Sequence, residues 1–155
     1  MIQGSCLCGA IKFQISNLSG PMEICHCNRC RKTSGSNSLT TIHVRTEDLE
    51  FTHGSALIKS YAAPILYSEP PYQSHFCSEC GSPTPPANTR ERMTEIPAGL
   101  LDDDPCIKPD KHIFIEFLPN WDTITDDIPQ FDIRDLIRER RDEELPADFE
   151  LKTHR

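Results

Sequence analysis

Seven of the eight cysteines in this 155-residue chain fall into three short groups, a spacing typical of metal ligands. The groups contain Cys6 and Cys8, then Cys25, Cys27 and Cys30, and finally Cys77 and Cys80. Thiolates so close in sequence bind zinc well, whereas thiols two positions apart seldom form an unstrained disulfide. The sequence therefore predicts metal binding, and reduced or bridged cysteine pairs without a metal are the alternative.

The first and third groups have the same local pattern, because a glycine directly follows the second cysteine of each, at Gly9 and Gly81. Glycine permits a left-handed turn in which backbone N–H groups face the thiolate sulfurs. Together the two groups supply four thiolates, which is a complete ligand set for a structural zinc. A metal joining Cys8 to Cys77 would close most of the domain into a loop, a constraint worth about 4 kcal/mol. Loss of this metal is expected to unfold the domain.

The middle group supplies three thiols and no fourth cysteine. Zinc with three protein ligands keeps an open position for water or substrate, as in catalytic sites. We therefore predict a second, catalytic zinc site at Cys25, Cys27 and Cys30. His26 lies between two of these ligands, and we expect its side chain to point away from the metal, either exposed or behind the ligands. A ligand role for His26 is the alternative.

Three basic residues, Arg29, Arg31 and Lys32, surround the middle group in a chain that is otherwise acidic. Cations favour the thiolate form of a nearby cysteine and attract carboxylates. The three are therefore candidates for binding a small anionic substrate, with a solvated basic turn as the alternative. Residues 33–37 are polar and contain a glycine, which predicts a loop that wraps around a ligand.

The overall charge of the chain argues against several classes of partner. Sixteen basic and twenty-four acidic residues leave a formal net charge of −8, which disfavours nucleic acid and acidic lipid. The first ten residues lack the pattern of a signal peptide, and no apolar run is long enough to cross a membrane. We expect a cytoplasmic protein, in which closely spaced thiols stay reduced and free to bind metal.

Alternating apolar residues and β-branched runs predict strands at residues 10–15, 39–44, 57–61 and 111–118. Thirteen prolines exclude a long helix through the middle of the chain, so we expect a mainly β fold. Ile133, Leu136 and Ile137 have the spacing of a short amphipathic helix. We predict a zinc-binding domain over residues 1–131. Residues 132–155 are predicted to be a charged tail, a short helix that caps the domain in solvent and then a loose end.

Three segments of the chain match the signature blocks of a known family, at residues 4–10, 25–31 and 76–81. In this order they resemble the glutathione-dependent formaldehyde-activating enzymes, which share a domain with centromere protein V. Residues 99–102, 109–114 and 121–122 resemble the C-terminal half of the same family.

The resemblance implies a β-tent fold, in which small antiparallel sheets surround a structural zinc held by the first and third cysteine groups. It also implies a second zinc at the middle group. The activity that it implies is that of a carbon–sulfur lyase interconverting glutathione plus formaldehyde with S-hydroxymethylglutathione. In that reaction the nearby cations would oppose the carboxylates of glutathione.

A different class of function also fits these residues. The chain could be a zinc-stabilised binding module without catalysis, in which the middle cysteine group is vestigial or senses redox state. A third class, a zinc-ribbon protein that binds nucleic acid, conflicts with the net charge of −8.

Several single residues are expected to have no part in the chemistry. We predict that Cys106 is a small buried apolar residue, that Trp121 packs in the core or at a sheet edge, and that Glu79 is exposed. The remaining histidines have no metal-ligand spacing and are assigned no role; they are His43, His53, His112 and His154.

Overall fold

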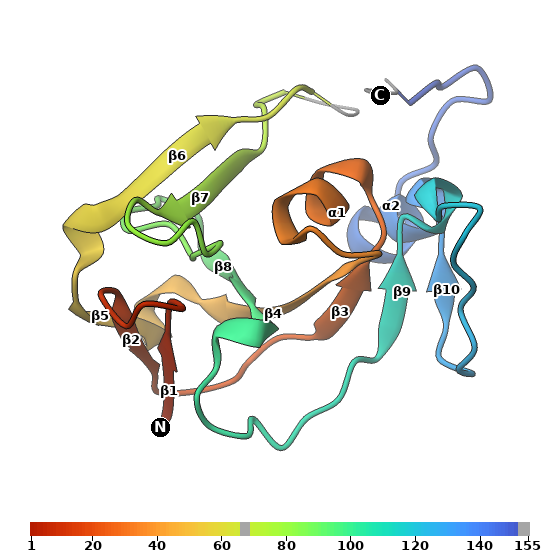
Figure 1. Ribbon diagram of the computed structural model, residues 1–155. Helices are drawn as coiled ribbons and strands as arrows, with labels where there is room; N and C mark the ends of the chain where they lie inside the picture. The colour runs from red at the N-terminus through yellow and green to blue at the C-terminus, as the bar shows by residue number, and fades with distance from the viewer. Residues whose placement is uncertain (66–68, 152–155) are drawn as a thin grey trace.

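The computed structural model describes residues 1–65 and 69–151 and is built mainly from short strands (Figure 1). Ten strands and two α-helices occur in these two ranges. The strands form three sheets, with the orders β1-β2-β5, β10-β9-β3-β4-β8 and β6-β7. The prediction of a mainly β fold with small sheets is therefore confirmed. None of the helices in the described ranges is long and apolar enough to cross a membrane.

The first sheet is antiparallel and consists of β1 (Ile2–Ser5), β2 (Lys12–Ile15) and β5 (Leu49–His53). Strand β2 lies within the segment predicted from alternating apolar residues. Its Phe13 and Ile15 are about 1% exposed and pack with residues of the second sheet in one apolar core. Burial of this one face explains why the period of two in the sequence produces a strand.

The second sheet contains five strands and mixes two directions. Its strands are β3 (Met22–Cys25), β4 (Leu39–Arg45), β8 (Met93–Pro97), β9 (Lys111–Ile113) and β10 (Gln130–Phe131). The β3–β4 and β4–β8 pairs are antiparallel, whereas β9 runs parallel to both β3 and β10. Strand β3 ends at Cys25, so the middle cysteine group lies at the end of this sheet.

The third sheet is the hairpin of β6 (Ile58–Ala62) and β7 (Gln73–Cys77), which lies on the opposite side of the molecule from β9 and β10 (Figure 1). Strand β6 confirms the strand predicted at 57–61. Strand β7 ends at Cys77, so the hairpin carries the third cysteine group toward the β1–β2 loop.

Two of the expected elements end differently from the sequence prediction. The loop expected over residues 33–37 begins only after Ser34, because helix α1 (Asn28–Ser34) includes the first two of these residues. The Ser34 hydroxyl donates to the carbonyl of Cys30 in the preceding turn. The strand expected over 111–118 stops at Ile113, because Phe114 adopts a left-handed backbone (φ 58°) and a 3-10 turn follows. This turn buries the Phe114 side chain beside Cys25 and Cys27.

Helix α2 (Ile133–Arg141) confirms the predicted amphipathic helix and begins at a capping box formed by Asp132 and Asp135. Its apolar residues Ile133, Leu136 and Ile137 are buried in one cluster with Cys25, Cys27 and Phe114. The boundary after residue 131 stays a prediction. What the structure shows is that α2 packs directly behind the middle cysteine group, and Phe149 and Leu151 add to the same cluster.

Candidate metal centres

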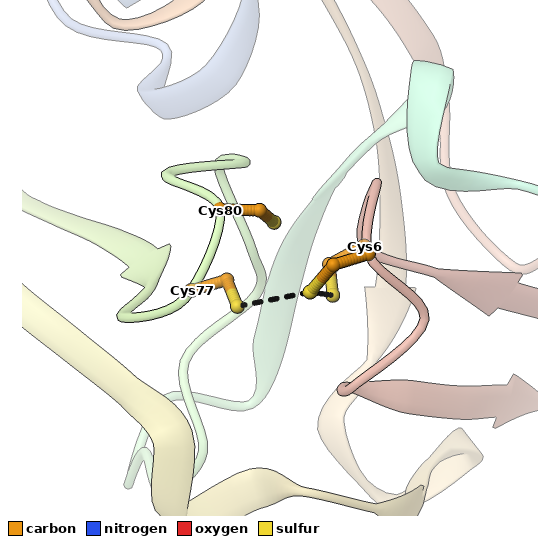
Figure 2. Close-up of side chains that lie close together, drawn as sticks. Cys6, Cys77 and Cys80 are labelled. Carbon is orange, nitrogen blue, oxygen red and sulfur yellow. Dashed lines mark hydrogen bonds between the residues drawn. The ribbon is translucent and has the colours of Figure 1, made fainter.

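The first and third cysteine groups meet in space, although most of the domain separates them in sequence. The sulfurs of Cys6, Cys8, Cys77 and Cys80 all lie within 4.8 Å of one another. Figure 2 shows Cys6, from the loop after β1, facing Cys77 at the end of β7 and Cys80 in the next turn. The Cys6–Cys8 and Cys8–Cys77 sulfur separations are 3.5 Å and 4.0 Å. Tetrahedral zinc with 2.3 Å bonds to sulfur needs separations of about 3.8 Å, so these four residues fit zinc.

The two turns that carry these thiols have the same geometry. Gly9 and Gly81 adopt left-handed conformations, with φ of 73° and 74°, as predicted. Their N–H groups donate to the carbonyl oxygens of Cys6 and Cys77, each at 2.9 Å. The N–H of Ile11 also donates to the Cys6 sulfur at 3.3 Å. Such N–H···S contacts stabilise a thiolate, the form that binds metal.

The middle group forms a second cluster, in which the sulfurs of Cys25, Cys27 and Cys30 lie within 4.8 Å of one another. Cys25 ends β3, Cys27 is the N-cap residue of α1 and Cys30 lies in the first turn of α1. The backbone N–H of Cys30 donates to the Cys27 sulfur at 3.4 Å. Because the cysteine at the N-cap accepts this bond, the local fold of the helix end itself brings the three thiols together.

These three thiols share one negative charge readily. Hydrogen bonds from the Cys25 and Cys30 thiols, together with the Cys30 N–H and the nearby Arg29, hold the pKa of Cys27 far below its usual value. Hydrogen bonds to Cys27 and Cys30 and nearly complete burial raise the pKa of Cys25. The three thiols therefore titrate as one coupled group. Metal binding would displace the remaining protons.

A cavity of about 140 Å³ opens beside the middle group. Besides the three cysteines, its walls include Arg29, Thr41, Tyr72, Glu95, Phe114 and Arg140. Thr41, Tyr72 and Glu95 also line a larger cleft of about 400 Å³ that runs along β7 and β8. The three-thiol cluster therefore lines a cavity that shares three wall residues with a cleft of the size that binds small molecules.

The three cations predicted around the middle group lie in different environments. Arg29 lines the cavity, and its guanidinium carbon lies 5.1 Å from the ring centre of Tyr72. Arg31 instead donates to the carbonyl of Phe117 at 2.8 Å, and Lys32 is exposed. Neither Arg31 nor Lys32 is among the residues that line the cavity or the cleft. Binding of a substrate by these cations stays a prediction.

Tyr72, Glu95 and Arg140 line the cavity, although no motif in the sequence marks them as site residues. Burial raises the pKa of the Tyr72 hydroxyl, so Tyr72 stays a hydrogen-bond donor at neutral pH. No spacing rule connects these residues to Cys25. Only the position of Tyr72 shortly before the third cysteine group offered a signal in the sequence.

His26 and His112 form a buried pair beside the middle cysteine group. His26 is 3% exposed and is not part of the three-thiol group, so of the two positions expected for it the structure shows the buried one. Its Nε2 lies 2.8 Å from Nδ1 of His112, whose Nε2 lies 3.0 Å from the carboxylate of Asp126. An ionised carboxylate only accepts, so His112 donates to Asp126 and accepts from His26. His112, assigned no role from sequence, thus holds the loop between Cys25 and Cys27.

The expectations for Cys106 and Trp121 are wrong, whereas that for Glu79 is confirmed. Cys106 is exposed in a turn with φ of 55°, where its N–H donates to Asp104, so it is not buried. Trp121 is 71% exposed and lies beneath the guanidinium of Arg31. Glu79 is exposed, as predicted. Among the other histidines, His43 contacts Glu23, His53 is exposed, and His154 lies outside the described residues.

The chain is similar to proteins of one known family. The model of a family described as glutathione-dependent formaldehyde-activating enzyme matches residues 1–117. The chain belongs to this family. A protein of Halomonas elongata named after the same family is 32% identical over 124 residues, which cover 78% of this chain and 79% of the relative.

The fold of this family member also resembles a solved structure. The match is the crystal structure of a Rhodobacter sphaeroides protein, with a TM-score of 0.50 and 21% identity. The alignment covers 66% of this chain and 91% of that one. At this identity the likeness concerns the fold alone. Residues 118–151, which include α2, lie beyond the part matched by the family model.

Proposed function

We propose that the protein is a zinc-dependent carbon–sulfur lyase that condenses glutathione with formaldehyde to S-hydroxymethylglutathione and catalyses the reverse reaction. The observation that carries this proposal is the cluster of three thiols, which lines a cavity that shares Thr41, Tyr72 and Glu95 with a larger cleft. The family suggests the two substrates. A reducing cytoplasm is the compartment in which both the protein thiols and the substrate thiol stay available.

In the forward reaction the substrate sulfur attacks the aldehyde carbon. A carbon–sulfur bond forms, the π bond of the carbonyl breaks, and the proton lost by the thiol ends on the new hydroxyl oxygen. When bound by Cys25, Cys27 and Cys30, zinc would supply an open position for a sulfur or a carbonyl oxygen.

The residues around the cavity have complementary tasks in this proposal. Arg29 lies at the cavity wall, where its guanidinium attracts a substrate carboxylate. Tyr72 lines both the cavity and the cleft, where its protonated hydroxyl can donate a hydrogen bond to the oxygen of the aldehyde. Arg31 and Lys32 lie outside the cavity wall and would act only through their positive charge.

The test is the rate of adduct formation and breakdown, followed by NMR exchange on zinc-loaded protein. We expect the protein to accelerate the exchange above the uncatalysed background, and the Cys27→Ser variant to lose this acceleration. Cys106→Ser is the matched control, because Cys106 is exposed and belongs to neither cluster. Equal rates for the wild type, the Cys27→Ser variant and protein-free solution would refute the proposal.

Metal counting separates the lyase from the alternative binding module. The lyase requires two zinc ions per chain, one of which Cys27→Ser should remove. One tightly held zinc, unaffected by Cys27→Ser, would favour a module stabilised by the first and third cysteine groups alone.

A further inference from the structure

Arg140 reaches the cavity from an element that the sequence indicated to be a solvated cap. It lies in the last turn of α2 and lines the cavity together with the three cysteines and Arg29. Its side chain is 39% exposed, so it is accessible from solvent. Helix α2 lies beyond the residues matched by the family model. Neither the family match nor the cysteine pattern therefore assigns a role to Arg140.

A buried carboxylate holds this arginine in place. Glu23, in β3, is 1% exposed and accepts a hydrogen bond from Nη2 of Arg140. His43 lies 3.2 Å from the same carboxylate oxygen, and Lys111 lies 4.0 Å from the other one. Glu23 thus anchors the Arg140 guanidinium from the interior of the molecule.

The bond to Glu23 occupies only one of the N–H groups of the Arg140 guanidinium. Within the described part of the chain, the hydrogen bond to Glu23 is the one that Arg140 makes, through Nη2. Arginine has five N–H donors in a planar fork that matches a carboxylate. At the same cavity wall, Nε of Arg29 is buried and has no hydrogen-bond partner in that part of the chain. Two arginines with free guanidinium donors therefore line the same cavity as the three thiols.

The charges of the adjoining cleft differ in sign from those of these arginines. The acidic residues on its walls are Glu91 and Glu95, of which Glu95 also lines the cavity, and no Lys or Arg of the described residues lines the cleft. The two arginines therefore attract a carboxylate within the cavity, and the two glutamates attract an ammonium group along the cleft. A thiol substrate that carries both groups fits this separation of charge.

We propose that Arg140, together with Arg29, binds a carboxylate of the substrate thiol beside the middle cysteine group. Helix α2 is then part of the substrate site, and the enzyme prefers thiols that bear a carboxylate over neutral thiols. This inference rests on the proposed function, because it assigns the substrate of the same cavity. Glu23 acts as a positioning residue that aims the guanidinium.

The test compares two substrates with each variant. We expect Arg140→Gln to lower kcat/KM for glutathione about tenfold or more, the value of a charge-assisted hydrogen bond. For glutathione diethyl ester, in which both carboxylates are blocked, the same variant should change kcat/KM less than about twofold. The glycine monoethyl ester then distinguishes which carboxylate is bound. Arg141→Gln is the matched control, since it removes an exposed arginine from the same helix end.

Damage to the fold gives a different result from loss of the contact. Arg140→Gln leaves the buried Glu23 with fewer partners, and a loosened site would lower the rates for glutathione and for the diester equally. Arg140→Lys keeps a charge near Glu23 but not the planar fork, so a partial loss restricted to glutathione is expected. Equal losses with both substrates, or the same loss in Arg141→Gln, would overturn the inference.

A binding measurement separates this inference from the proposed reaction. Calorimetry on zinc-loaded protein should show tighter binding of glutathione than of its diethyl ester, and Arg140→Gln should remove the difference. If the wild type binds in this way but does not accelerate adduct exchange, the reaction is refuted and the carboxylate site stands. If it accelerates the exchange but binds both thiols equally well, the carboxylate site is refuted and the reaction stands.

Discussion

Arg29 and Arg31 show how two identical residues, two positions apart, come to face different surroundings. In an α-helix two positions correspond to a rotation of about 200°, so their side chains leave α1 on nearly opposite faces. Arg29 lines the cavity and stacks on Tyr72. Arg31 caps the carbonyl of Phe117 instead. Of these two arginines, Arg29 therefore faces the cavity, whereas Arg31 stabilises the local fold.

His112 provides a prediction at the same scale. His112→Ala should destabilise the zinc-loaded protein by about 1–3 kcal/mol, because the buried Nε2–H of His26 would lose its acceptor. Urea denaturation followed by circular dichroism measures this change. His53→Ala, at an exposed position, is the control and should lie within about 0.5 kcal/mol of the wild type. An equally small effect of His112→Ala would contradict the role assigned to the histidine pair.

Helix α2 is the element whose role differs most from its appearance in the sequence. Its charged residues suggest a solvated segment, but three of its nine residues are buried behind Cys25 and Cys27. Phe114 joins this cluster because its left-handed backbone ends β9 and turns the chain back toward α2. The helix therefore supports the middle cysteine group from behind while Arg140 reaches its open side.

Truncation of a single buried side chain tests this support. Leu136 is 2% exposed, and Leu136→Ala should destabilise the protein by about 2–5 kcal/mol, the range for a buried leucine. Thermal unfolding of zinc-loaded protein gives the measurement, and the exposed Arg141→Ala serves as the control. Unchanged stability of Leu136→Ala would mean that α2 is not needed for the fold.

In the molecule as a whole, the two cysteine clusters lie in different surroundings. The four-cysteine cluster joins the β1–β2 loop to the end of the β6–β7 hairpin and lies on an apolar cluster with Ile11. The three-cysteine cluster lies at the end of the central sheet, against α2 and the cavity. A metal at the first cluster would hold distant parts of the chain together, whereas the second cluster is held by local structure.

The two clusters should therefore respond differently to loss of a ligand. Cys77→Ser should lose one zinc and about 4 kcal/mol of stability, because the loop between the distant cysteines is no longer closed. Cys27→Ser should also lose one zinc but retain a cooperative unfolding transition close to that of the wild type. Zinc content by atomic absorption and urea denaturation of both variants provide the measurements. Equal stability of the two variants would show that the four-cysteine cluster does not hold the fold together.

The candidate ligands could be predicted from the sequence because their determinants are local. Cys25, Cys27 and Cys30 converge through one strand end and one helix cap, and Gly9 and Gly81 set two equivalent turns. Short-range spacing of this kind survives in any fold that the rest of the chain adopts. Strand β2 and helix α2 could also be predicted from the sequence, because in each element the spacing of apolar residues follows from burial of one face.

Only the tertiary structure determined what surrounds these thiols. Tyr72 directly precedes β7, Glu95 lies in β8 and Arg140 lies in α2. No local sequence pattern links these residues to Cys25. His112 meets His26 because β9 runs parallel to β3, a pairing of segments far apart in sequence. Substrate recognition depends on such long-range contacts, and their geometry is set by the packing of whole elements. The cysteine pattern therefore determined where a metal would bind, and the packing of sheets and helix determined which charges face it.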